Sequence, residues 1–212
     1  MLTKYAIHKL FLLICAFVVL HASFLSLSIE GQLDWSRLRY FTILSNAWVG
    51  VGFLLMALLE PERHDLRTYV SLAVLIPITV TGLVYNLVLV PLTGANPVYV
   101  GYSNLVTHLL ATVMVLVNYM VFEPKGLLKV RHLPAGVVPG LLYWVVSMVV
   151  GSHPYFFMDP VAIGWVMTGV WLVGLVVVMG LLTAGLFVYD RIKGKPKQYV
   201  REQAKNPYED VF

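Results

Sequence analysis

The chain alternates between long stretches without a charged residue and short segments that carry nearly all of its charges. Five stretches contain no Asp, Glu, Lys or Arg: residues 10–29, 40–59, 68–122, 132–158 and 160–189. About 20 apolar residues span the hydrocarbon core of a bilayer, so each stretch can hold at least one transmembrane helix. The longest stretch is too long for one helix, and a turn-forming segment rich in Pro, Gly and Asn at residues 91–97 divides it into two.

The pattern therefore predicts six transmembrane helices, at residues 10–29, 39–59, 69–92, 101–122, 133–152 and 162–189. Transmembrane strands would alternate in polarity, whereas these segments are apolar all round, so we expect an all-α fold. The short connections favour an antiparallel bundle. We expect one six-helix transmembrane domain over residues 1–190 and a basic cytoplasmic tail over residues 191–212.

Composition excludes most other classes of protein. Apolar residues make up 59% of the 212 residues and charged residues 12%, whereas a soluble domain is about 25% charged. A water-soluble globule and a disordered chain are therefore excluded. Cys15 is the single cysteine, so a disulfide framework is excluded as well. We expect neither a metal site nor a cofactor.

The positions of Lys and Arg predict the orientation in the membrane. Arg37 and Arg39 lie between the first two helices, and the other 13 of the 15 basic residues all lie on the opposite predicted side. The positive-inside rule therefore places both termini in the cytoplasm. The basic tail is expected to lie against anionic lipid headgroups, so the net charge does not indicate a nucleic-acid partner.

Polar side chains within the predicted helices gather toward the outer ends. Thr42 and Asn46 are four residues apart and share one face of the second helix, and Asn104 and His108 do so on the fourth. An imidazole can take the proton of a hydroxyl, which makes it a better nucleophile. Thr42 and His108 are therefore a candidate nucleophile and base, with Asn104 orienting the imidazole.

Ester cleavage also needs donors for the negative charge that develops on the carbonyl oxygen. Asn46, Asn86 and Tyr85 are the candidates for this role. The same residue types also have structural roles in membrane helices, where amides join neighbouring helices and threonines bond a carbonyl of the preceding turn. Spacing alone leaves both interpretations open.

Charged and aromatic residues lie at the predicted outer surface. Arg37 and Arg39 can hold a substrate carboxylate or extend into the interface as ordinary basic side chains. Asp159 can orient His108 or cap the sixth helix. An aromatic belt without a catalytic role is expected at the same level, formed by Trp35, Tyr40, Tyr99, Tyr102, Tyr155 and Trp165.

Five segments resemble the signatures of a prokaryotic family of six-helix membrane proteins. They are residues 40–46 (YFTILSN), 81–86 (TGLVYN), 104–108 (NLVTH), 122–126 (FEPKG) and 153–159 (HPYFFMD). The resemblance covers most of residues 5–190. That family is similar to the eukaryotic androgen-induced and androgen-dependent membrane hydrolases, atypical threonine hydrolases that cleave fatty acid esters of hydroxy fatty acids.

The resemblance implies a threonine-type ester hydrolase with Thr42 as nucleophile and His108 as base, and it implies a membrane lipid or lipid-like ester as the partner. The expected location is a bacterial cytoplasmic membrane, with the site in the outer leaflet. Glycines along the sixth helix permit close helix contact, either inside the bundle or in a homo-oligomer.

Three other functions remain open from the sequence. A non-enzymatic lipid carrier or sensor would use the same cavity without cleaving its ligand. A b-type haem protein would use His21 and His108, which lie at similar depth on different helices, as axial ligands. A secondary transporter is the least favoured, because no charged residue lies within a predicted helix core.

Overall fold

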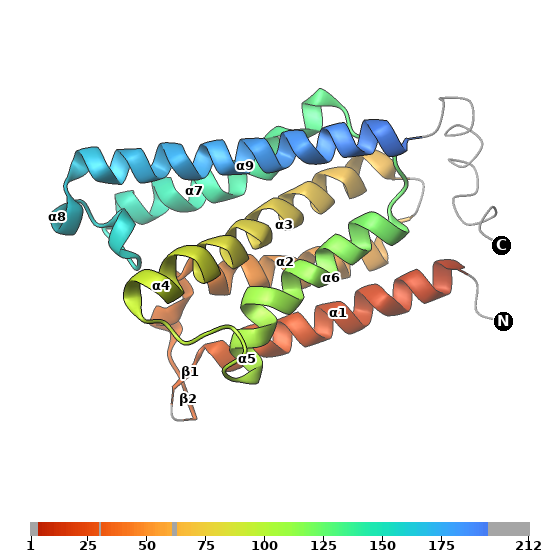
Figure 1. The fold of residues 1–212 in the computed structure, drawn as a ribbon. Coiled ribbons are helices and arrows are strands. Elements are labelled where there is room, and N and C mark those ends of the chain that lie inside the picture. The colour runs from red at the N-terminus through yellow and green to blue at the C-terminus, as the bar shows by residue number, and fades with distance from the viewer. Residues whose placement is uncertain (1–3, 30, 61–62, 195–212) are drawn as a thin grey trace.

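The fold, a computed structural model, is a bundle of long helices, and it describes residues 4–29, 31–60 and 63–194 (Figure 1). Within these residues, six helical segments are long and apolar enough to cross a membrane: Lys4–Ser26, Phe41–Leu58, His64–Thr93, Tyr102–Phe122, Val130–Val150 and Trp165–Lys193. The prediction of an all-α bundle with six apolar helices is confirmed.

Several of the six segments are built from more than one element. The first two and the last are single helices: α1 (Lys4–Ser26), α2 (Phe41–Leu58) and α9 (Trp165–Lys193). The others are composite: α3 (His64–Val84), η2 (Tyr85–Leu89) and α4 (Val90–Thr93); α5 (Tyr102–Leu105), η3 (Val106–Leu110), α6 (Ala111–Val117) and η4 (Asn118–Phe122); η5 (Val130–His132) and α7 (Pro134–Val150). The elements η2, η3 and η4 are π-helical turns, which are rare and frequently occur at functional sites.

Short elements lie in the connections at one end of the bundle. They are the hairpin β1 (Ser28–Ile29) and β2 (Gln32–Leu33), the 3₁₀ turns η1 (Trp35–Arg39) and η6 (Phe156–Met158), and the short helix α8 (Pro160–Ile163). The first residues of α1 and the last residues of α9 lie together at the other end of the bundle, away from the hairpin (Figure 1). This arrangement follows from an even number of antiparallel crossings.

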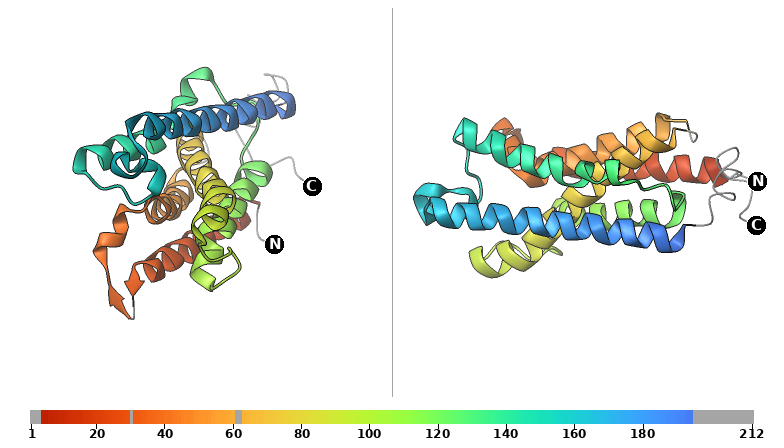
Figure 2. Two further views of the ribbon diagram at one scale, coloured as in Figure 1. Left: turned by 60° about the vertical axis from the view of Figure 1, so that its left-hand side comes forward. Right: turned by 90° about the horizontal axis from the view of Figure 1, so that it is seen from above.

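Helix α3 is the centre of the bundle. It contacts α2, α6, α7 and α9, with α1, α2 and α6 on one side and α7 and α9 on the other (Figures 1 and 2). Close approach depends on small residues. A Cβ atom on Gly52 of α2 would lie 2.4 Å from Cγ2 of Val74 on α3, and one on Gly50 would lie 2.4 Å from Cγ of Leu20 on α1. Glycine at these two positions therefore allows the three helices to pack closely.

Several helix boundaries differ from the sequence prediction, and the first and third helices begin earlier than expected, at Lys4 and His64. The first helix was predicted to continue to residue 29, but it ends at Ser26 because Ser28 and Ile29 pair with the strand Gln32–Leu33. The turn contains Gly31 with a positive φ of 81°, a backbone conformation that residues other than glycine rarely adopt. The last helix continues to Lys193, so the first basic residues of the expected tail belong to α9. Residues 195–212 lie outside the described residues.

Candidate active site

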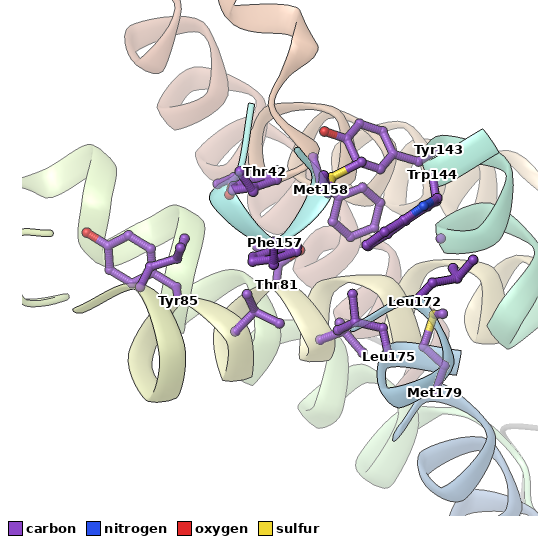
Figure 3. A pocket seen from close by; sticks show the side chains of 16 residues that line it. Thr42, Thr81, Tyr85, Tyr143, Trp144, Phe157, Met158, Leu172, Leu175 and Met179 are labelled. Carbon is purple, nitrogen blue, oxygen red and sulfur yellow. Dashed lines mark hydrogen bonds between the residues drawn. The ribbon is translucent and has the colours of Figure 1, made fainter. Parts of the chain in front are cut away.

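Two adjoining cavities lie at the end of the bundle that carries the hairpin. The larger, which we call the polar cavity, has a volume of about 760 Å³, and Arg37, Thr42, Tyr85, Asn104 and His108 are among its lining residues. The smaller, which we call the apolar slot, has a volume of about 50 Å³ and lies between α2, α3, α7 and α9 (Figure 3). The two cavities share four lining residues, namely Thr42, Tyr85, Leu89 and Tyr155. Thr42 therefore lies where the two cavities meet.

The first turn of α2 positions Thr42. Tyr40 is extended and precedes the helix, and its carbonyl accepts from the N–H groups of Ile43 and Leu44. The N–H of Thr42 instead donates to the hydroxyl oxygen of Tyr155 (3.3 Å), and the Thr42 hydroxyl lies 3.4 Å from the same oxygen. Because partial positive charge collects at a helix N-terminus, this environment favours negative charge near Thr42.

The surroundings of His108 define which ring nitrogen carries the hydrogen. Nδ1 lies 3.1 Å from the carbonyl oxygen of Asn104 and 3.1 Å from the hydroxyl of Thr107. The carbonyl can only accept, and the Thr107 hydroxyl already donates to the carbonyl of Ser103 (2.8 Å), so Nδ1 must be the donor. Nε2 of a neutral His108 is then unprotonated and can accept a proton. The ring also stacks on Tyr85, with a centroid distance of 3.5 Å.

Thr42 and His108 share the polar cavity without a direct contact. No hydrogen bond joins the two side chains within the described part of the chain. Asn46 links their backbones, because its amide group donates to the carbonyls of Thr42 (2.8 Å) and Thr107 (2.9 Å). Its side-chain oxygen is buried without a partner. Asn46 thus connects the two helices that carry the candidate pair, and both of its N–H bonds are used in doing so.

The other candidate donors are also engaged elsewhere. The Tyr85 hydroxyl donates to the carbonyl of Asn96 (2.6 Å), and the Asn86 amide donates to a carbonyl one turn back in its own helix (2.8 Å). The Asn104 amide donates to the carbonyl of Pro97 (2.9 Å). Asn104 therefore orients the imidazole through its main-chain oxygen and not through its side chain. None of these amide and hydroxyl donors is directed at the threonine.

The charged candidates separate in the structure. Arg37 lines the polar cavity. Arg39 does not line it, and its guanidinium instead lies 5.4 Å from the ring centre of Tyr40. The carboxylate of Asp159 accepts from two backbone N–H groups at the start of α8 (2.9 and 3.3 Å). Asp159 is therefore a helix cap and does not line either cavity.

Tyr155 is the site residue that sequence reasoning missed, because it was assigned to the aromatic belt. Its ring stacks on Phe157 (5.2 Å) and meets the edge of Tyr40 (6.0 Å), and its hydroxyl reaches Thr42 as described above. Burial raises the pKa of Tyr155 above its usual value, so the hydroxyl keeps its proton and remains a donor. The contact joins residues 113 positions apart, so no local pattern could have indicated it.

His21 and His108, the pair suggested for haem, do not line a common cavity among the two described above. His21 stacks on Phe17 (5.9 Å) and lies 3.5 Å from the hydroxyl of Tyr102, and it does not line the polar cavity with His108. Within the described residues, no three His, Cys, Asp or Glu side chains are grouped closely enough to hold a metal ion.

The arrangement thus combines a hydroxyl at a helix N-terminus, a neighbouring tyrosine hydroxyl and an imidazole with an unprotonated nitrogen, all bordering one cavity. These are the groups that acyl transfer requires. Comparison with known proteins adds no identification, since no family model, curated protein or solved structure matches the chain.

Proposed function

We propose that the protein is an intramembrane hydrolase of lipid esters, with Thr42 as nucleophile and His108 as general base. The observation that carries this proposal is that both residues line one cavity, which continues past Thr42 into an apolar slot. A lipid ester has the same division, with a polar group in the middle of the molecule and an aliphatic chain beside it. Fatty acid esters of hydroxy fatty acids are the expected substrates.

The reaction has two steps. Nε2 of His108 takes the proton of the Thr42 hydroxyl while its oxygen attacks the ester carbonyl carbon, and the imidazolium then gives this proton to the leaving alkoxide. The product of this step is an acyl-threonine and a free alcohol. In the second step His108 takes a proton from water while the water oxygen attacks the acyl carbonyl carbon, and the acid leaves as the imidazolium gives that proton to the Thr42 oxygen.

Two features support this mechanism before substrate binds. The Tyr155 hydroxyl, beside Thr42, is placed to donate to the carbonyl oxygen as that oxygen becomes negative, and the N-terminal end of α2 favours the same charge. Hydrogen bonds between nucleophile and base are often long or unmade until substrate is present, so the missing Thr42–His108 contact is compatible with this role.

The membrane setting follows from the distribution of charge. Apolar side chains are exposed along the outer helices, as at Val149 (81% exposed), Val166 (80%) and Leu181 (68%), and such a surface suits contact with lipid. The positive-inside rule places both termini in the cytoplasm of a bacterial cell. The cavities lie at the opposite end of the bundle, which corresponds to the outer leaflet.

The test is hydrolysis of a fatty acid ester of a hydroxy fatty acid by the purified protein. Thr42→Ala and His108→Ala should each abolish product formation, and Thr42→Ser should restore part of it. Thr79→Ala is the matched control, because the Thr79 hydroxyl bonds a carbonyl of its own helix (2.7 Å) and does not line either cavity. Full activity in Thr42→Ala would overturn the proposal.

A lipid carrier or sensor is the second candidate, favoured by the lack of a hydrogen bond between Thr42 and His108. It predicts that a lipid copurifies with the protein and stays intact, and that a fluorophosphonate probe does not label Thr42. Labelling at Thr42 that disappears in His108→Ala would decide for the hydrolase.

A further inference from the structure

The apolar slot has one polar end and one apolar end. Thr42, Thr81 and Tyr85 lie toward one side, and Trp144, Leu172 and Met179 lie toward the other (Figure 3). Arg37, the cationic side chain in the lining of the two cavities, is in the polar cavity and not in the slot. A molecule that bridges the two cavities therefore has its polar or charged part on one side of Thr42 and its aliphatic part on the other.

We propose that the apolar slot binds the acyl chain of the substrate and that the polar cavity holds the alcohol part. This proposal rests on the proposed hydrolase function, and it adds the orientation of the ester. With the carbonyl carbon at Thr42, the acyl chain extends toward Trp144 and Met179. The hydroxy acid extends into the polar cavity, where Arg37 can pair with its carboxylate.

The dimensions of the slot favour a single unbranched chain. Its volume of about 50 Å³ is roughly a third of an apolar cavity that takes up benzene, so the slot as it stands admits only a short, slender part of a chain and excludes a ring. Met158 and Met179 line it, and methionine side chains rearrange easily. The slot can therefore lengthen around a slender chain but resists a wider one.

Gly140 on α7 controls the space at the far end of the slot. A Cβ atom on Gly140 would lie 2.7 Å from the sulfur of Met179 on α9, and 3.2 Å from its methyl carbon. Any larger side chain at this position must enter the slot or displace Met179. Gly174, on the same helix as Met179, has no atom within 4 Å of its Cβ position, so it offers a matched control for adding bulk.

The first measurement is binding without hydrolysis. A fatty acid that carries bromine on its terminal carbon, and so remains unbranched, should quench the fluorescence of Trp144 saturably in the purified full chain, and Trp144→Phe should remove that component. Gly140→Leu should weaken the binding by about tenfold or more, the size of effect expected when a few methylenes are excluded from an apolar pocket. Gly174→Leu should bind as the unmodified chain does. Equal quenching in the two leucine variants would overturn the proposal.

The second measurement is hydrolysis of esters with one alcohol and a series of acyl lengths. Gly140→Leu should shift the preference toward shorter acyl chains. Met179→Ala removes most of a side chain that lines the slot, so it should shift the preference toward longer chains. If both variants hydrolyse esters with unchanged acyl preference, the acyl chain does not lie in the slot. The proposed orientation of the ester is then wrong, whereas the hydrolase function is not affected. If hydrolysis is absent while Trp144 is still quenched saturably, the hydrolase proposal fails and the slot remains a binding site for an aliphatic chain.

Discussion

Replacing Tyr155 by phenylalanine separates a structural role of its hydroxyl from a chemical one. The ring contacts with Phe157 and Tyr40 remain, so the variant loses a single oxygen. That oxygen accepts the N–H of Thr42 at 3.3 Å and lies 3.4 Å from the Thr42 hydroxyl. Both distances are near the upper limit for a hydrogen bond, so the bonds are weak before substrate binds.

The expected magnitudes of the two roles differ. Loss of a neutral hydrogen bond lowers the free energy of unfolding by about 0.5–1.5 kcal/mol, and a bond this long belongs at the lower end of that range. Loss of a donor to the developing oxyanion lowers kcat by about 10²- to 10³-fold. We therefore expect Tyr155→Phe to remain folded, with nearly unchanged KM and a fall in kcat of that size.

The assay combines thermal unfolding in detergent with steady-state hydrolysis at saturating ester. Tyr69→Phe is the matched control, because the Tyr69 hydroxyl donates to the carbonyl of Arg131 at 3.2 Å, far from both cavities. It should lose a similar amount of stability without losing kcat. A kcat within twofold of the unmodified chain in Tyr155→Phe would refute the role of the hydroxyl in the reaction.

Two further predictions concern stability. Gly136→Ala should lower the free energy of unfolding by about 1–3 kcal/mol, because its Cβ would lie 2.5 Å from the Thr183 hydroxyl oxygen. Gly174→Ala has open space and should change it little, and equal thermal shifts would contradict this. Glu123→Gln should cost about 3–5 kcal/mol, since it leaves the buried guanidinium of Arg67 without the carboxylate 3.3 Å away. An unfolding midpoint equal to that of the unmodified chain would show that this pair does not stabilise the fold.

The helices could be predicted from the sequence because their signal is local. A charge-free stretch of sufficient length is a property of consecutive residues, and it does not depend on which helices pack together. The hairpin after the first helix was missed because Ser28 and Ile29 belong to the same charge-free stretch as the helix. Their pairing with Gln32 and Leu33 depends on the turn at Gly31, a backbone preference that hydropathy does not measure.

The site could be predicted only in part, because donor use depends on contacts between helices. The sequence placed Thr42 and His108 toward the outer ends of their helices, and both line the polar cavity. Spacing along the sequence could not show that the amide of Asn46 joins two helices, or that the amide of Asn86 donates within its own helix. Nor could it place Tyr155 beside Thr42, since the loop that carries it is positioned by packing of Phe157 and Met158 against α7 and α9.

The tautomer of His108 is the most direct test of the proposed base. The carbonyl of Asn104 and the hydroxyl of Thr107 both lie at Nδ1 as acceptors, so the neutral ring should carry its hydrogen there and leave Nε2 unprotonated. In the ¹⁵N-histidine NMR spectrum of the protein, at a pH where the ring is neutral, the His108 signals assigned with His108→Gln should show protonated Nδ1. If Nε2 carries the hydrogen instead, it cannot accept the Thr42 proton. His108 would then be unable to act as the base, whatever its distance from the threonine.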